Sequence, residues 1–505
     1  MLLPLAVALA SLAASASAAP IVQIAQGELA GTSADGVAAF RGIPYAAAPL
    51  GPLRWKAPAA PKSWRGVRAA DASGPVCIQS PVDWAGHALD HTSEDCLTLG
   101  VWTPKVAVSA RLPVMVWFHG GGYTAGAGSQ YDGAKLARHG AVIVAVNYRL
   151  GALGFLAHPA LTAESPLHSS GNYGLLDQIA ALKWVRANIA RFGGNPDNVT
   201  IFGQSAGGGS AMLLTVSPLA RGLFQKAIFE SGSALNVPGV RDGEDLHLPD
   251  AEKAGLATAT ALHANSLAAL RALPASAFLG RDIAGISHGP IVDGKIIPED
   301  ITTAWRAHRD APVPVLLGWN SNESARFIGP VTRADYLSNI KQFGRLAPDF
   351  LRLYPAADDA EASRAAVDLG SDFGFGWRSW SLAEARLAKT SPATFVYQFD
   401  NPPPGPDGTR TRGAVHSDEL RYVWGDDAAE DKWPAADKAL EAAIQTYWVN
   451  FARTGDPNGP GLVRWTPYRP GRTALWFANG AAKAGHVLRE EKLRAMDQAL
   501  RQPTR

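Results

Sequence analysis

Two runs of β-branched and other apolar residues lie at 114–118 and 141–146, and each ends in glycine or a polar turn. Such runs are typical of buried strands in a mostly parallel sheet. From Leu175 to Ile189, apolar side chains recur every three or four residues, which predicts an amphipathic helix. A further apolar run at 198–203 predicts another strand, and 205–216 predicts the helix that follows it. Strand and helix therefore alternate, which predicts an α/β fold with right-handed crossovers.

The rest of the chain continues this pattern after one long interruption. From about 239 to 290 the periodicity loosens into alanine-rich helical pieces, which we interpret as an excursion from the sheet that could roof a pocket. Strands are predicted again at 313–317 and 393–399, and 442–458 predicts a long helix ended by a glycine and a proline. No internal repeat or low-complexity linker marks a boundary, so residues 19–505 are predicted to form a single domain.

The first 18 residues carry no charged side chain. A short apolar run is followed by Ala16-Ser17-Ala18, the small-residue pattern of a secretory cleavage site. We therefore predict a signal peptide at 1–18 and a secreted or periplasmic protein, with a buried first helix as the alternative. The run is too short to span a membrane, and no other stretch reaches 18 apolar residues, so no membrane span is expected.

The charge of the chain bears on its partners, and its cysteines bear on a possible disulfide. The formal net charge is +2, and lysine and arginine are not gathered into runs, so nothing suggests a nucleic-acid partner. The chain has two cysteines, Cys77 and Cys96. In an exported chain they could form a disulfide, which would stabilise the fold by about 3 kcal/mol in the chain-entropy account. A reactive thiol is the alternative, although neither cysteine has a histidine or a basic cluster beside it.

One serine lies in an unusual setting between the strand at 198–203 and its helix. In Gly203-Gln204-Ser205-Ala206-Gly207, glycines stand two residues before and two residues after Ser205. Glycine at these positions lets two backbones approach without a Cβ clash, and the sharp turn often puts the serine at positive φ. The turn would hold the hydroxyl at the N-terminus of a helix, whose dipole favours developing negative charge. Ser205 is therefore the candidate nucleophile.

A serine nucleophile needs a base and a carboxylate that orients the base. For a serine on such a turn, the acid and then the histidine follow later in the chain. His416, in "GAVHSDELRYVW", is the preferred base, and His486 is the alternative. Glu323 directly follows the strand at 313–317, at the edge of the sheet where α/β sites form, and is the preferred acid. Asp293 is its rival, although the Asp-Gly pair there is typical of a turn.

The tetrahedral intermediate of acyl transfer also needs hydrogen-bond donors for its oxyanion. A run of glycines at 120–122 follows the strand at 114–118, which leaves backbone N–H groups able to point at a ligand. The expected donors are the amides of Gly121, Gly122 and Ala206, each worth about 3 kcal/mol of the barrier. A flexible turn is the alternative interpretation of the glycine run.

Several longer blocks resemble the type-B carboxylesterases, the family that includes the cholinesterases. They are "FRGIPYAAAPLGPLRWKAP" (40–58), "SEDCLTLGVWTP" (93–104), "WFHGGGYTAG" (117–126), "VNYRLGALGFL" (146–156), the stretch 171–208 around Ser205, and "NFARTGDPN" (450–458). The resemblance covers nearly the whole chain after residue 18. It implies an α/β-hydrolase fold, a nucleophile at Ser205, an acid at Glu323, a base at His416, oxyanion amides at Gly121, Gly122 and Ala206, and a disulfide between Cys77 and Cys96.

The chain departs from this family near the site. The family's acid usually lies in a sequence like "GTNxDEG", whereas Glu323 stands in "GWNSNES", so its loop could turn differently. Gln204 replaces the glutamate that precedes the nucleophile in cholinesterases, which removes one negative charge. Because the family's second and third cysteine pairs are missing too, specificity for cationic choline esters is in doubt. Glu94, in "SEDC", is interpreted as half of a structural salt bridge, with Arg41 as its predicted partner.

These observations favour one interpretation. We expect a serine carboxylesterase that hydrolyses small-molecule esters through an acyl-enzyme intermediate, with Ser205, His416 and Glu323 as its triad and with no metal or organic cofactor. Two alternatives are a catalytically inactive binding or adhesion protein on the same fold, and an amidase that uses the same triad. The protein is expected to be a monomer or a homodimer.

Overall fold

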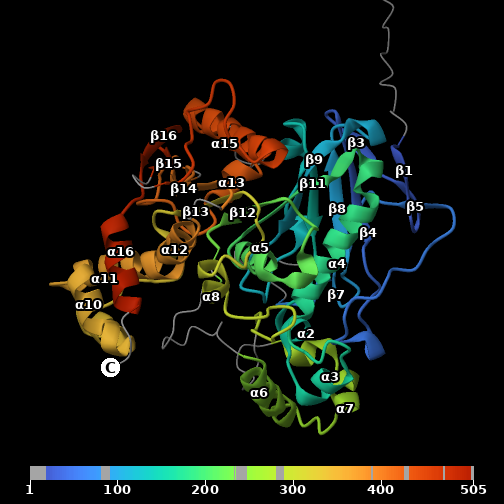
Figure 1. The fold of residues 1–505 in the computed structure, drawn as a ribbon, viewed down its shortest axis with the longest axis horizontal. Coiled ribbons are helices and arrows are strands. Elements are labelled where there is room, and N and C mark those ends of the chain that lie inside the picture. The colour runs from blue at the N-terminus through green and yellow to red at the C-terminus, as the bar shows by residue number, and fades with distance from the viewer. Residues whose placement is uncertain are drawn as a thin grey trace, which may run out of the picture.

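The computed structural model describes residues 19–80, 91–232, 234, 247–279, 289–387, 391–405, 407–425, 432–469 and 473–501. Within these residues, the centre of the molecule is a sheet of 11 strands (Figure 1), in the order β16-β15-β14-β13-β12-β11-β9-β10-β8-β4-β3. The predicted signal peptide, 1–18, lies outside the described residues.

The middle of the sheet is parallel and its two edges are antiparallel. From β10 across to β15 each strand runs parallel to its neighbour, whereas β8, β4 and β3 on one side and β16 on the other pair antiparallel. The predicted mostly parallel sheet is therefore confirmed. Its strands are β3 (Thr32–Ala34), β4 (Val37–Pro44), β8 (Thr98–Thr103), β9 (Leu112–Phe118), β10 (Val142–Val146), β11 (Gly194–Gln204), β12 (Lys226–Glu230), β13 (Val315–Asn320), β14 (Thr394–Asp400), β15 (Thr473–Ala478) and β16 (Ala481–His486).

Smaller elements and helices surround this sheet. One small sheet contains β1 (Ile21–Ile24), β2 (Gly27–Ala30) and β5 (Val67–Ala69). A second contains β6 (Val76–Cys77) and β7 (Thr92–Ser93). The described α-helices are α1 (Ala134–Arg138), α2 (Gly151–Phe155), α3 (Pro159–Glu164), α4 (Tyr173–Asn188), α5 (Ala206–Val216), α6 (Leu248–Ala261), α7 (Leu267–Ala272), α8 (Ile301–Arg306), α9 (Arg333–Lys341), α10 (Ala347–Leu353), α11 (Asp359–Ser371), α12 (Trp377–Ala385), α13 (Leu420–Val423), α15 (Ala435–Thr454) and α16 (Glu490–Arg501).

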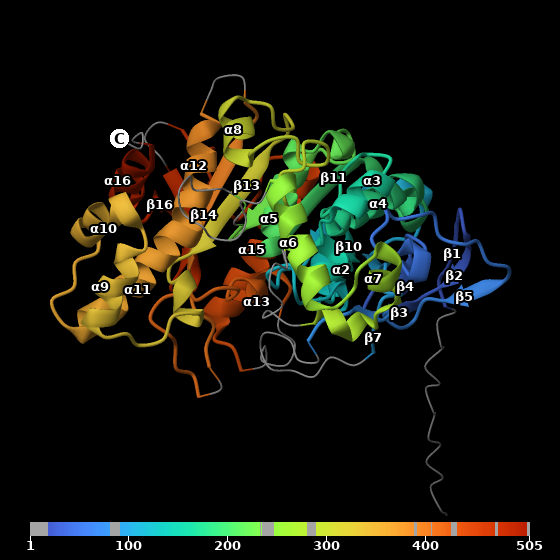
Figure 2. The same ribbon diagram turned by 90° about the horizontal axis from the view of Figure 1, so that it is seen from below.

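Helices cover both faces of the sheet, because alternate side chains of a strand point to opposite faces. In β9, Val116 belongs to the core cluster that contains the buried residues of α4 and α5. Its neighbour Trp117 belongs to a second cluster, with the buried residues of α1 and α15. Burial on both faces explains why these strands read as near-continuous apolar runs. Helices α9, α10, α11 and α16 lie at one end of the molecule, and β1, β2 and β5 lie at the other (Figures 1 and 2).

Most of the predicted elements are present. The predicted strands are confirmed as β9, β10, β11, β13 and β14, and the predicted helices as α4, α5 and α15. Helix α15 begins at Ala435, earlier than the predicted 442, since its first two turns are rich in alanine, leucine, lysine and glutamate, which favour helix. It ends at Gly455, whose φ of 84° is the left-handed conformation that commonly closes a helix.

The predicted excursion at about 239–290 is described at 247–279 and again from 289. It contains the helical pieces α6 and α7, as expected. Their buried residues Ala259 and Leu270 pack with Trp55, α2 and α3 in a separate apolar cluster. This packing lies away from the cavity beside Ser205, which no residue of 247–279 lines.

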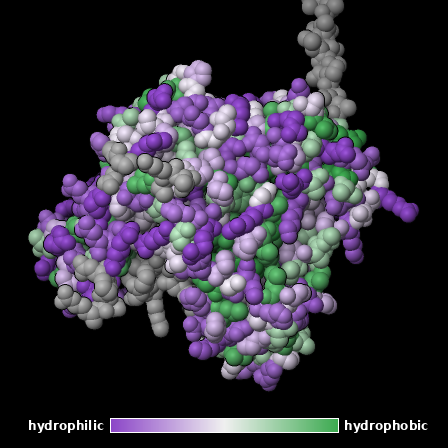
Figure 3. Space-filling model, in the orientation of Figure 1, coloured by the Kyte–Doolittle hydropathy of each residue, from purple (hydrophilic) through white to green (hydrophobic). Residues whose placement is uncertain are grey.

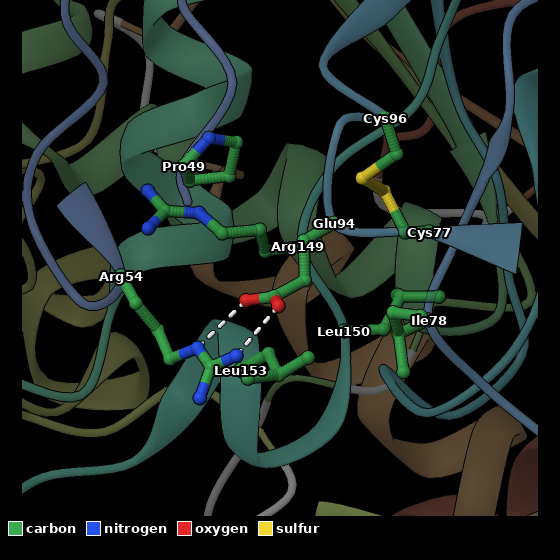
Figure 4. Close-up of a pocket in the computed structure, with 9 residues that line it drawn as sticks. All are labelled: Pro49, Arg54, Cys77, Ile78, Glu94, Cys96, Arg149, Leu150 and Leu153. Atoms are coloured by element: carbon green, nitrogen blue, oxygen red, sulfur yellow. Dashed lines mark hydrogen bonds and ion pairs between the residues drawn. A yellow bond between two sulfur atoms is a disulfide. The ribbon is translucent and has the colours of Figure 1, made fainter. Parts of the chain in front are cut away.

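The two cysteines lie beside an ion pair close to the N-terminal strands (Figure 4). Cys77 and Cys96 form the expected disulfide. Glu94 binds Arg54 through two hydrogen bonds of 2.7 and 2.6 Å, so the predicted partner Arg41 is wrong. Arg41 lies within β4, whereas Arg54 directly follows the short 3-10 turn Gly51–Leu53, which brings its side chain to Glu94. The pair is largely buried, with side chains 7% and 13% exposed.

The face of the molecule in Figure 3 is mainly polar. Hydrophilic residues cover most of it, and apolar residues gather in a smaller area near its centre. None of the described helices combines the length and the apolar character needed to cross a membrane.

Candidate active site

Ser205 lies at the sharp turn from β11 into α5. Its φ of 56° and ψ of −125° lie outside the regions that L residues prefer. The flanking glycines allow this turn. A Cβ at position 203 would lie 2.5 Å from the carbonyl carbon of Gly207, and a Cβ at position 207 would lie 1.9 Å from the carbonyl oxygen of Phe118. Because no side chain fits at either distance, the glycines around Ser205 are required by the close approach of three backbone segments.

Backbone hydrogen bonds hold this turn at the carboxyl ends of the parallel strands. The amide of Ser205 donates to the carbonyl oxygen of Glu230, the last residue of the neighbouring strand β12, at 2.9 Å. The carbonyl oxygen of Ser205 accepts the first amide bond of α5, from Gly209, at 2.8 Å. Ser205 is therefore the residue that begins the helix, where the helix dipole favours negative charge.

His416 lies in the loop before α13 and contacts Glu323. Its Nδ1 lies 2.6 Å from Oε2 of Glu323, and its backbone amide donates to the carbonyl oxygen of Glu323 at 3.3 Å. The ring centroids of Phe375 and Phe327 lie 4.7 and 5.2 Å from the centroid of the imidazole. A carboxylate acceptor at Nδ1 favours the tautomer with the proton on Nδ1, which leaves Nε2 as the basic nitrogen. That Nε2 lies 3.3 Å from the side-chain nitrogen of Gln204.

Glu323 begins the 3-10 turn Glu323–Arg326 just after β13 and is fully buried. Besides the contact with His416, its other carboxylate oxygen accepts the Ser231 hydroxyl at 2.6 Å and the Asn320 backbone amide at 2.7 Å. Asn320 also donates from its side chain to the carbonyl oxygen of Val415, at 2.8 Å. The departure from the family sequence around Glu323 therefore does not turn its carboxylate away from His416.

The two rival residues lie in other surroundings. His486 is an exposed residue at the end of β16, where it pairs with Thr473. Asp293 is buried, and its carboxylate accepts the Ser169 hydroxyl at 2.5 Å and three backbone amides of the turn that follows it, from Lys295, Ile296 and Ile297. Of the candidate acids and bases, the structure thus brings together Glu323 and His416.

A cavity of about 270 Å³ lies beside the turn. Both Gly121 and Gly122 have positive φ, at 106° and 59°. A Cβ at position 121 would lie 2.1 Å from the carbonyl oxygen of Ala125, so this residue must be glycine. Ala206, the third predicted donor, is the first residue of α5. The described residues that line the cavity are Gly120, Gly121, Gly122, Gly126, Gln130, Tyr131, Gln204, Ser205, Arg326, Phe327, His416, Ser417 and Leu420.

His119 precedes the glycine run and is a second histidine close to the site. It is buried, its ring stacks on Tyr148 at 4.3 Å, and its Nδ1 lies 2.9 Å from the carbonyl oxygen of Gly120. Burial lowers the pKa of His119 to about 4, so the imidazole is neutral at neutral pH. We interpret His119 as a support for the glycine loop.

Sequence analysis missed two buried glutamates close to Glu323. Glu230 ends β12, where its carboxylate accepts the Trp448 indole N–H at 2.7 Å, and Glu419 accepts the Asn320 side chain at 2.5 Å. Burial raises the pKa of Glu230 to about 8. Burial, and then the charge of Glu323, raise the pKa of Glu419 well above its ordinary value. The available signal was a carboxylate that directly follows the three apolar residues of the strand "KAIFE".

Glu230→Gln should make the stability of the protein less sensitive to a rise in pH from 5 to 8. The pKa of Glu230 rises from 4.5 to about 8 on folding, so the unfolded chain ionises first and stability falls as pH rises through this window. Glutamine removes this loss and can still accept the Trp448 bond. The stability of the variant relative to the native chain should increase by about 3 kcal/mol between pH 5 and pH 8 in urea denaturation. The exposed Glu28→Gln is the control, and an equal difference at both pH values would contradict the assignment.

Comparison with known proteins finds relatives over nearly the whole chain. A sequence model described as the carboxylesterase family matches residues 18–496. The chain is 38% identical to fumonisin B1 esterase from Sphingopyxis macrogoltabida, over 87% of this chain and 83% of that protein. It is 37% identical to para-nitrobenzyl esterase from Bacillus subtilis (strain 168), over 89% of this chain and 92% of that one. It is 36% identical to liver carboxylesterase from Sus scrofa, over 92% and 91%.

Solved structures show the same likeness. A structure of PNB esterase superposes with a TM-score of 0.81 at 32% identity, covering 96% of this chain and 99% of that chain. A thermophilic PNB esterase also gives a TM-score of 0.81, covering 94% and 99%. The expected α/β-hydrolase fold is therefore confirmed. The chain belongs to the carboxylesterase family and is a carboxylic ester hydrolase.

Proposed function

We propose that the chain hydrolyses carboxylic esters through an acyl-enzyme intermediate, with Ser205 as nucleophile, His416 as general base and Glu323 as the acid that orients it. The observation that carries this proposal is the 2.6 Å contact between His416 Nδ1 and Glu323 Oε2, beside a cavity that both Ser205 and His416 line. The two bonds that Glu323 accepts from Ser231 and Asn320 hold its carboxylate in place for this contact.

The proposed reaction has two halves. His416 Nε2 takes the proton from Ser205 as the hydroxyl oxygen attacks the ester carbonyl, and then gives that proton to the leaving alcohol. Water repeats the cycle on the acyl-enzyme and releases the acid. Glu323 keeps the imidazole in the required tautomer and stabilises the imidazolium that forms. The amides of Gly121, Gly122 and Ala206 are the proposed donors to the oxyanion.

Two substrates and one label test this function. The protein should hydrolyse 4-nitrophenyl acetate, and a fluorophosphonate should stop turnover by modifying Ser205, as peptide mass analysis would show. An inactive binding protein would hydrolyse nothing, and full inactivation with the label on another serine would contradict the nucleophile. The matched amide, 4-nitroacetanilide, separates the amidase alternative, since an esterase should turn it over far more slowly than the ester.

We also propose that the protein is secreted or periplasmic, as a single catalytic domain at 19–505. The disulfide between Cys77 and Cys96 supports an oxidising compartment. Intact mass of the protein from its natural host should show a chain that begins near Ala19 and gains two mass units on reduction. A retained leader with two free thiols would contradict export.

A further inference from the structure

The cavity beside Ser205 has an unequal distribution of charge. Among the described residues that line it, Arg326 carries the permanent charge, His416 is the other titratable side chain with a basic group, and no aspartate or glutamate takes part. Gln204, directly before Ser205, puts a neutral amide in the wall. The described wall therefore favours negative over positive groups on a substrate.

Arg326 is placed by the same turn that places Glu323. The two residues are the last and the first of the 3-10 turn Glu323–Arg326, and residues three apart in such a turn project from the same side. One guanidinium nitrogen, Nη1, donates to the carbonyl oxygen of His416 at 3.2 Å. This contact orients the guanidinium beside the catalytic loop and leaves further N–H donors on its planar fork.

Arg326 forms no ion pair with any residue that the structure describes. Asp418 lies near Arg326, but burial raises the pKa of its carboxyl to about 6, and its Oδ2 accepts the backbone amide of Val415 at 2.8 Å, while the charge of Arg326 is a smaller influence that favours ionisation. The exposed ring of Phe327 follows Arg326 and lies against His416, which adds an apolar surface next to the cation. A cation beside an apolar wall suits a substrate that joins a hydrocarbon segment to an anionic group.

We propose that Arg326 makes this site selective for esters that carry a carboxylate, on either the acyl or the alcohol part, over their uncharged analogues. The inference rests on the proposed function of Ser205 and adds a substrate class to it. Arg326 acts here as a specificity residue, because its guanidinium can bind a carboxylate through two parallel, charge-assisted hydrogen bonds. Cationic esters should be poor substrates for the same reason.

Matched pairs of substrates test the proposal. For the acyl side, the pair is 4-nitrophenyl hydrogen adipate and 4-nitrophenyl methyl adipate. For the alcohol side, it is 4-acetoxybenzoate and its methyl ester. The measured quantity is the ratio of kcat/KM for the anionic member to that for the neutral member. Comparing this ratio between variants cancels the intrinsic reactivities of the esters, and it also cancels any general effect of a variant on the His416 loop.

In at least one pair, Arg326→Gln should lower this ratio about tenfold, the size expected for a charge-assisted hydrogen bond at a partly exposed site. Arg326→Lys should retain only part of the ratio, because lysine keeps the charge but cannot form two parallel hydrogen bonds. High salt should reduce the ratio for the native chain. Arg221→Gln is the matched control: it removes the same charge, but Arg221 is an exposed residue shortly before the amino end of β12, whereas Ser205 follows the carboxyl end of the parallel strand β11.

The outcomes separate this inference from the proposed function. Ratios that stay within about twofold of the native value in Arg326→Gln for both pairs would overturn the role of Arg326, while hydrolysis of the neutral esters would still support the function. A ratio of kcat/KM for 4-(trimethylammonio)phenyl acetate to that for 4-acetoxybenzoate that does not rise in Arg326→Glu would also overturn it. Failure of all these esters to react, with no label on Ser205, would overturn the proposed function itself.

Discussion

Ser205→Ala should lower kcat for 4-nitrophenyl acetate by up to about 10⁶-fold, the size seen when the nucleophile is removed from serine proteases built on the same triad. The fold should be nearly unaffected. The Ser205 side chain makes no capping hydrogen bond to α5, and alanine has the same Cβ at the same positive φ. Steady-state kinetics with thermal unfolding of both proteins would measure the two effects together.

Ser210 provides a matched control on the same helix. It lies within α5, is fully buried, and accepts a hydrogen bond from Gln178 at 3.0 Å, but it does not line the cavity. Ser210→Ala should therefore lower stability by about 1 kcal/mol and leave kcat within a small factor of the native value. The assignment of Ser205 would be wrong if its alanine variant kept most of the activity, or if Ser210→Ala lost as much.

Glu323→Gln should lower kcat by about 10⁴-fold while the protein stays folded. The amide keeps the size of the carboxylate but cannot hold His416 in the tautomer with the Nδ1 proton, and it does not stabilise the imidazolium. The precedent is the corresponding aspartate-to-asparagine change in serine proteases. Since the change acts on the charged state of His416, kcat should fall far more than KM changes, and labelling of Ser205 by a fluorophosphonate should slow in parallel.

Two aspartates provide controls for this prediction. Asp293 accepts three backbone amides and the Ser169 hydroxyl, so Asp293→Asn should cost stability rather than catalysis. Asp418 accepts the Val415 amide, a bond that asparagine can keep, so Asp418→Asn should have a small effect on both. Loss of turnover in folded Asp293→Asn, together with an active Glu323→Gln, would show that the acid has been assigned to the wrong residue.

The parts of the site that follow local backbone rules could be predicted from the sequence. A serine between two glycines after an apolar run specifies its own turn, because the close approach of Phe118 to Gly207 excludes any side chain there. The partners Glu323 and His416 lie 93 residues apart, and they were paired in advance by their order, by the strand that precedes Glu323 and by the resemblance to a family. Their contact depends on Asn320, which ties the two loops together.

What could not be predicted depends on packing between distant segments. The predicted partner of Glu94 was wrong, because strand periodicity does not show which of two nearby arginines the fold brings next to this glutamate. The burial of Glu230 depends on Trp448, which lies 218 residues later. The position of Arg326 on the cavity wall depends on the turn that contains it and on its hydrogen bond to the carbonyl oxygen of His416. No sequence motif predicts this position.

The strand order of the sheet also sets the sequence of events when the chain is made. Ser205, Glu323 and His416 all emerge from the ribosome before β15, the strand that covers the open edge of β14. Until then the nascent chain carries the open parallel edge of β14, which invites aggregation. Long-range parallel pairing of this kind also slows folding. Biosynthesis of this protein is therefore expected to depend on chaperones that hold the chain until its last strands arrive.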